Sequence, residues 1–144
     1  APPPAHRSLF CRNGLKYYAR IPAANIRAAL AEVERQRRVL ARSEPATPGG
    51  ELLVWELDMA ARMAAQSCRF MLWQQALAAG HEALARRMAA RNIRLLEGLD
   101  AEFNACWPRR NKGTPRKCSA FLRWRMDDYR AGVLPDSPAA PGGA

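Results

Sequence analysis

The residues from Glu51 to about Ala79 contain no proline or glycine, and this stretch constrains the fold more than any other part of the chain. Apolar side chains recur along it at the three- and four-residue spacing of an α-helix. They form two neighbouring rows: Leu53, Leu57, Ala60, Ala64, Cys68 and Met71 in one, and Leu52, Trp55, Met59, Met63, Phe70 and Trp73 in the other. A helix that is apolar on two sides lies centrally or is wedged between two partners.

Helices are also predicted on both sides of this stretch. Pro22 suits the first turn of a helix, and apolar residues then recur at helical spacing as far as a loop at 43–50, which is rich in proline and glycine. Gly80 separates the long helix from a third one, at about 81–107. The short connection between these two long helices makes them antiparallel neighbours.

A fourth helix completes the predicted architecture. The hydroxyl of Thr114 precedes Pro115, a combination that favours a helix start, and Gly132 ends the pattern. The strict alternation of a β-strand is found nowhere in the sequence. We therefore predict an all-α antiparallel bundle of about four helices at 22–132, with an irregular segment at 1–21 and a disordered Pro/Gly/Ala tail at 133–144.

The chain is strongly basic, with 23 Lys and Arg residues against 13 Asp and Glu residues and a net charge of +10. Such a charge permits binding to phosphate backbones or to anionic membranes. No apolar run reaches the ~18 residues that a membrane-spanning helix needs, and the N-terminus carries no signal-peptide pattern. We predict no membrane partner, and the sequence does not indicate a cell compartment.

Residues for metal or nucleophilic chemistry are few and scattered. The histidines are His6 and His81, and neither stands in a Ser-His-Asp or Cys-His arrangement. The cysteines are far apart and lack the spacing of zinc ligands: Cys11, Cys68, Cys106 and Cys118. The adjacent or nearby carboxylates, Glu56 with Asp58 and Asp127 with Asp128, are typical of surface charges. We predict no catalytic residue, metal or cofactor in this chain.

A basic turn between the last two long patterns is the clearest binding candidate. Its cations are Arg109, Arg110, Lys112, Arg116 and Lys117. Trp107, Phe121 and Trp124 flank it, and arginines beside aromatic rings can hold single-stranded nucleic acid. These rings also fall on the helical period, which favours core packing. An autonomous basic helical module that binds nucleic acid or another anionic partner is the alternative function.

The same turn carries a resemblance to a known family. The residues concerned are Glu102, Phe103, Trp107, Arg110, Asn111, Lys112, Gly113, Ser119, Leu122 and Tyr129, and upstream Glu51, Leu52, Leu53, Glu56, Leu57 and Met63. This pattern resembles the helical C-terminal region of bacterial family 20 glycoside hydrolases, the β-N-acetylhexosaminidase-like proteins. The most distinctive part is the motif formed by Trp107, Arg110, Asn111 and Gly113. Lys112 stands where the family usually has arginine.

The resemblance implies that the chain is part of a longer polypeptide. The family's (β/α)₈ barrel needs about 250 residues, and its chemistry uses an adjacent Asp-Glu pair that this sequence lacks. The chain is then a non-catalytic region that packs against the barrel. We expect the packing face to be Trp55, Met59, Met63, Phe70 and Trp73, and to be uncovered in the isolated chain.

Overall fold

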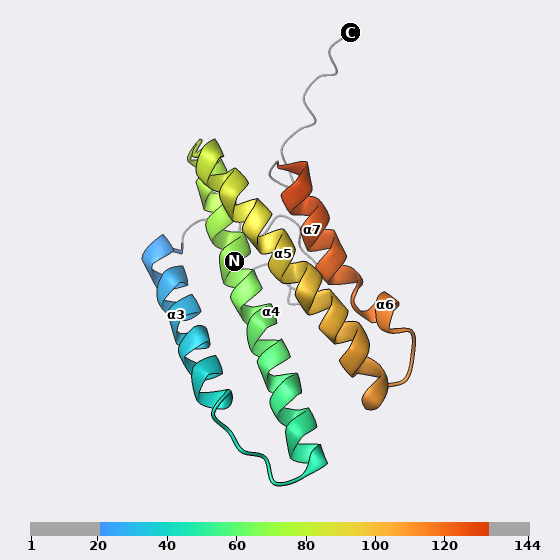
Figure 1. Cartoon of the computed structure of the whole chain (residues 1–144). Helices are drawn as coiled ribbons and strands as arrows, with labels where there is room; N and C mark the ends of the chain where they lie inside the picture. Colours follow the sequence, from blue (N-terminus) through green and yellow to red (C-terminus); the bar gives the residue numbers. More distant parts are fainter. Residues whose placement is uncertain (1–20, 133–144) are drawn as a thin grey trace, which may run out of the picture.

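The computed structural model describes residues 21–132, and these form helices and turns with no β-strand among them (Figure 1). This confirms the predicted all-α class. The predicted tails lie outside these residues, apart from Ile21 at the end of the first. The helices are α3 (Ala23–Leu40), α4 (Pro48–Ala78), α5 (Glu82–Cys106), the 3₁₀ turn η1 (Trp107–Arg109), α6 (Pro115–Cys118) and α7 (Ala120–Ala131).

Helix α4 lies at the centre of the described structure. Helix α3 packs on one side of it and α5 on the other, while α7 runs beside α5 (Figure 1). The core lies where α4, α5 and α7 meet. There the ring of Tyr129 lies edge-on to Phe70 and Trp73, with centroids 5.3 Å and 4.8 Å away. Leu96 and Leu99 of α5 are buried beside them.

Helix α4 begins three residues earlier than expected. Thr47 caps its N-terminus, because the side-chain oxygen accepts a hydrogen bond of 3.1 Å from the Gly50 amide. Pro48 occupies the first turn, where its missing amide hydrogen costs nothing. The prediction that the loop extends to Gly50 was therefore wrong, since a proline and two glycines can belong to a capped first turn.

The connection between α4 and α5 follows the prediction made at Gly80. Its φ angle is +73°, in the left-handed region that glycine adopts most readily. The Gly80 amide donates to the Leu77 carbonyl and the His81 amide to the Ala76 carbonyl, both at 2.9 Å. This hydrogen-bond pair closes the end of α4 and reverses the chain.

The predicted fourth helix is divided at Ser119. The Ser119 amide closes the short helix α6 on the Pro115 carbonyl at 2.9 Å, and the Ser119 carbonyl accepts the first bond of α7, from Leu122, at 3.0 Å. Its hydroxyl is buried between Asn104 and Arg123, at 3.3 Å and 2.9 Å. These contacts fix the bend and attach the start of α7 to α5.

The predicted packing face is the interior of the bundle, so this expectation was wrong. Met59, Phe70 and Trp73 are buried, while Trp55 and Met63 are partly buried against the same core. The Trp73 side chain is only 1% exposed to solvent. Large aromatic side chains bury the most area per residue, so packing with α5 and α7 selects this row of α4. No helix among residues 21–132 has the length and apolarity to cross a bilayer.

Candidate functional site

The first four residues of the α4 row that begins at Leu53 form one of the apolar surfaces that the described helices leave exposed. We define the α4 open row as Leu53, Leu57, Ala60 and Ala64, all of them exposed. Leu53 is 50% and Leu57 48% exposed, although both stand on a helix whose opposite side is core. The spacing of four, three and four residues keeps the row on one face over about 16 Å, and the row contains no charge.

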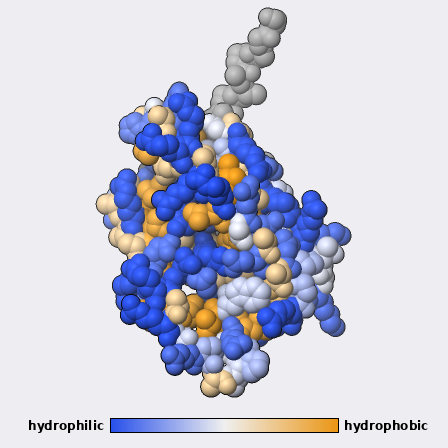
Figure 2. Space-filling model, in the orientation of Figure 1, coloured by the Kyte–Doolittle hydropathy of each residue, from blue (hydrophilic) through white to orange (hydrophobic). Residues whose placement is uncertain are grey.

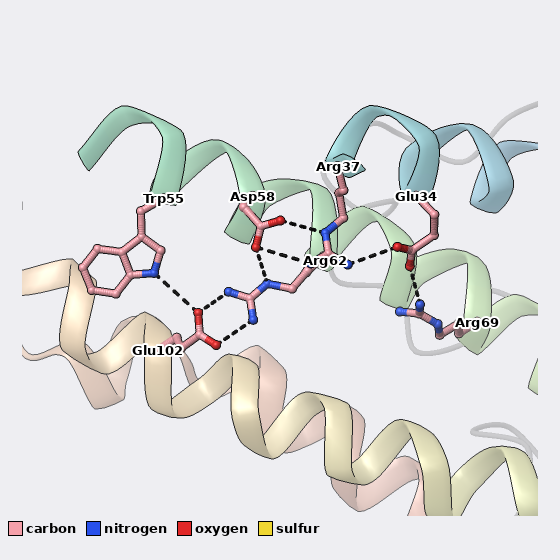
Figure 3. A network of polar contacts seen from close by, with 7 residues as sticks. All are labelled: Glu34, Arg37, Trp55, Asp58, Arg62, Arg69 and Glu102. Carbon is pink, nitrogen blue, oxygen red and sulfur yellow. Dashed lines mark hydrogen bonds and ion pairs between the residues drawn. The ribbon is translucent and has the colours of Figure 1, made fainter. Parts of the chain in front are cut away.

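A chain of alternating charges links α3, α4 and α5 (Figure 3). Arg37 of α3 donates to Asp58 of α4 through Nε at 2.8 Å. Arg62 Nε lies 2.9 Å from the same carboxylate but has no hydrogen-bond partner, so this contact is an ion pair. The Arg62 guanidinium then binds Glu102 of α5 with two hydrogen bonds, one of 2.7 Å. Trp55 Nε1 donates to Glu102 at 3.4 Å.

The same network extends along α3 through Glu34. Its two carboxylate oxygens accept from Arg37 at 3.1 Å and from Arg69 at 2.6 Å. The hydrogen bond from Arg62 lowers the pKa of Glu102 below its ordinary value. A carboxylate held ionised in this way is a poor proton donor at neutral pH. We interpret the network as a structural link between helices rather than an acid/base site.

Two cations of the basic turn contact side chains of α4, which the sequence did not indicate. Arg110 pairs with Glu56 of α4 at 2.8 Å, and the guanidinium of Arg109 lies 5.7 Å from the centre of a Trp55 ring. The other three cations of the turn, Lys112, Arg116 and Lys117, have no carboxylate partner among residues 21–132. The structure thus attaches one end of the turn to α4 and leaves the other end exposed.

The distinctive motif residues build this turn. Trp107 stacks on Phe103 with centroids 5.1 Å apart, and its Nε1 donates to the Lys112 carbonyl at 3.4 Å. The Asn111 amide donates to the Trp107 carbonyl at 3.0 Å. Gly113 has a φ angle of +102°, which only glycine adopts without strain. The motif therefore has a structural role, because it returns the chain from α5 to α6.

Several buried polar residues were not expected from the sequence. Asn92 Nδ2 donates to the Tyr129 hydroxyl at 3.1 Å inside the core. Burial also raises the pKa of the Tyr129 hydroxyl well above its ordinary value. Gln66 Oε1 and Gln74 Nε2 are buried in α4 without a hydrogen-bond partner. Their positions on an apolar face were the available signal, since a glutamine there must enter the core.

Reactive groups do not converge in the described part of the chain. Cys68 and Cys106 are buried, and desolvation raises the pKa of each thiol. Cys118 is half-buried, and His81 is exposed at the start of α5. Within residues 21–132 no three His, Cys, Asp or Glu side chains are grouped as metal ligands would be. His6 and Cys11 lie outside the described residues.

Comparisons of this chain with protein-family models, curated proteins and solved structures gave no match. The family resemblance therefore stays a prediction that depends on residues of this chain. Two structural features bear on it: the α4 open row and the turn that begins at Trp107. Both concern how helices pack.

Proposed function

We propose that this chain is a non-catalytic helical region of a β-N-acetylhexosaminidase-like glycoside hydrolase and packs against a (β/α)₈ catalytic barrel. The observation that carries the proposal is the α4 open row. Leu53 and Leu57 lie half-exposed on the central helix, followed by the small side chains of Ala60 and Ala64. An uncharged face of this kind is suited to burial against another apolar surface.

The shape of the open row also fits a helical partner. Ala60 and Ala64 are exposed and small, so a neighbouring helix can approach this part of the row closely. The outer layer of a (β/α)₈ barrel consists of helices, so it offers such a surface. This row replaces the aromatic row that the sequence analysis expected to face the barrel.

The turn supports the proposal from a second direction. Its family-like residues, Trp107, Asn111 and Gly113, form contacts that shape the chain between α5 and α6. Arg110 joins this turn to Glu56 of α4, near the exposed Leu53 and Leu57 in sequence. We propose that this motif orders the helical region beside the α4 open row.

The gene sequence immediately upstream of the codon for Ala1 tests the proposal. We expect an open reading frame in phase with Ala1 that encodes eight strand-helix repeats, about 250 residues, with an adjacent Asp-Glu pair. The 144-residue chain by itself should not hydrolyse a chromogenic β-N-acetylglucosaminide. An upstream stop codon, an unrelated upstream domain or hydrolysis by the chain alone would contradict the proposal.

A second candidate function is nucleic-acid binding at the free end of the turn. Lys112, Arg116 and Lys117 are unpaired among the described residues, and Trp124 of α7 is 50% exposed. Three phosphate contacts with a single strand give a slope of about −2 in log affinity against log salt concentration. Neutralising the three cations should abolish oligonucleotide binding. Binding that survives this change would remove the candidate.

A further inference from the structure

A groove runs between α3 and α5, with α4 as its floor. Two adjoining cavities of about 400 and 390 Å³ share Leu72 of α4 and Met88 of α5 in their walls. Leu30 of α3 and Leu84 of α5 add further apolar surface. Figure 2 shows hydrophobic residues in hollows between hydrophilic ones on the face that carries these helices. The groove is open because α3 and α5 both pack on α4 and little on each other.

The two sides of the groove carry unpaired positive charge. Arg27 of α3 and Arg91 of α5 line it, and neither has a carboxylate partner among residues 21–132. Arg87 and Arg94 stand one turn before and after Arg91 and are also unpaired. The one carboxylate in the lining, Glu34, is already bound by Arg37 and Arg69. An occupant therefore meets arginines whose charge is not compensated within the described fold.

The combination of an apolar floor and cationic sides selects among possible occupants. A nucleic-acid backbone would meet the arginines but would leave Leu30, Leu72 and Met88 without apolar contacts. An amphipathic helix with carboxylates on both flanks satisfies both parts, because its apolar face fills the groove while the carboxylates meet Arg27 and Arg91. From Leu84 to Asn92 the groove extends about 12 Å along α5, which is roughly two helical turns.

We infer that the α3–α5 groove binds an acidic amphipathic helix of a partner protein. The inference does not rest on the proposed function, since the groove and the α4 open row are different surfaces. Arginine and methionine are enriched at protein interfaces, which have an apolar centre and a polar rim. The free arginines set the orientation of the partner and the dependence of its binding on salt.

The probe is a synthetic helical peptide of about 15 residues, long enough to cover the groove. It carries leucines at positions i, i+4, i+7 and i+11, with glutamates on both flanks, and a fluorescein label at one end. Fluorescence anisotropy with the full 144-residue chain measures the affinity. A second peptide keeps the leucines and replaces every glutamate by lysine, and an oligo-dT of similar length represents nucleic acid.

The test variant is Arg27→Glu/Arg91→Glu, and the matched control is Lys112→Glu/Lys117→Glu. Each replaces two exposed, unpaired cations, and each lowers the net charge by four, from +10 to +6. The variants therefore differ in place and not in charge. Circular dichroism confirms that both are folded. Methyl NMR of wild-type protein locates the binding independently, because Met88 lies in the groove and Met126 is buried in the core.

We expect the acidic peptide to bind, to shift the Met88 methyl signal and to leave Met126 unchanged. The groove variant should weaken binding by about tenfold and the turn variant by less than about twofold. Absence of binding, equal effects of the two variants, or equal binding of the lysine peptide would overturn the inference. A shift of the Met88 methyl signal on addition of oligo-dT would also overturn it. If the groove variant does not fold, the inference is still tested with wild-type protein, by the shift of the Met88 methyl signal and by the comparison between the glutamate and lysine peptides.

Discussion

Replacing Trp73 with alanine gives the sharpest measure of which row of α4 belongs to the core. The side chain is 1% exposed, and its ring lies 5.1 Å from that of Phe70 and 4.8 Å from that of Tyr129. Removal of a buried indole loses its transfer free energy and leaves a cavity, together about 4 kcal/mol. A domain of this size has about 5–15 kcal/mol of stability, so the variant should lose between about a quarter and about four fifths of it.

Urea denaturation followed by circular dichroism at the helix band provides the assay. With a slope of about 2 kcal/mol per molar, the midpoint for Trp73→Ala should fall by about 2 M. Leu57→Ala is the matched control, because Leu57 lies on the same helix but is 48% exposed. It should cost less than about 1 kcal/mol. A cost below about 1 kcal/mol for Trp73→Ala, or equal costs for the two variants, would contradict the placement of Trp73 in the core.

Three further predictions concern the turn, the charge network and the buried hydroxyl. Gly113→Ala should destabilise the fold by about 1 kcal/mol, because the φ angle of Gly113 is +102°. Gly98→Ala should stabilise it by about 0.5–1 kcal/mol, because Gly98 lies within α5 and an added methyl group there meets open space. Chemical denaturation of both variants measures these changes. The pKa of Glu102 is lowered in the folded state, so its contribution to stability is present above the ordinary pKa of 4.5 and is lost as pH falls through the folded value. Glu102→Gln should therefore lose less stability than wild type between about pH 6 and about pH 3, and equal losses would contradict this. Tyr129→Phe leaves Asn92 Nδ2 buried without its acceptor, at a cost of about 1–3 kcal/mol, which thermal unfolding measures.

Much of the helical framework could be predicted from the sequence, because its boundaries depend on local chemistry. Gly80 and Gly132 end helices in the left-handed conformation that glycine adopts readily. The start of α4 was predicted three residues too late. A threonine followed by a proline and two glycines is compatible with a loop as well as with a capped first turn, and only the structure shows that Thr47 is the cap. At Ser119 the bend depends on tertiary contacts with α5, which no periodicity contains.

The candidate surfaces were harder to predict, because they depend on how helices meet. Both rows of α4 had helical spacing, and only packing against α5 and α7 assigns Trp73 to the core and Leu57 to the surface. The ion pairs from Arg37 to Asp58 and from Arg62 to Glu102 join different helices, so they require the register between helices. The α3–α5 groove exists because α3 and α5 both pack on α4 and little on each other, and the spacing of apolar residues within one helix does not show which residues border such a groove.

We propose that the α4 open row is a docking face for the barrel. Leu53→Glu/Leu57→Glu tests it directly, by co-purification of the helical chain with the product of the upstream open reading frame, which the proposed function expects to be the barrel. We predict that the variant keeps its unfolding free energy within about 1 kcal/mol but no longer retains the barrel. A variant that retains the barrel as wild type does would contradict the claim.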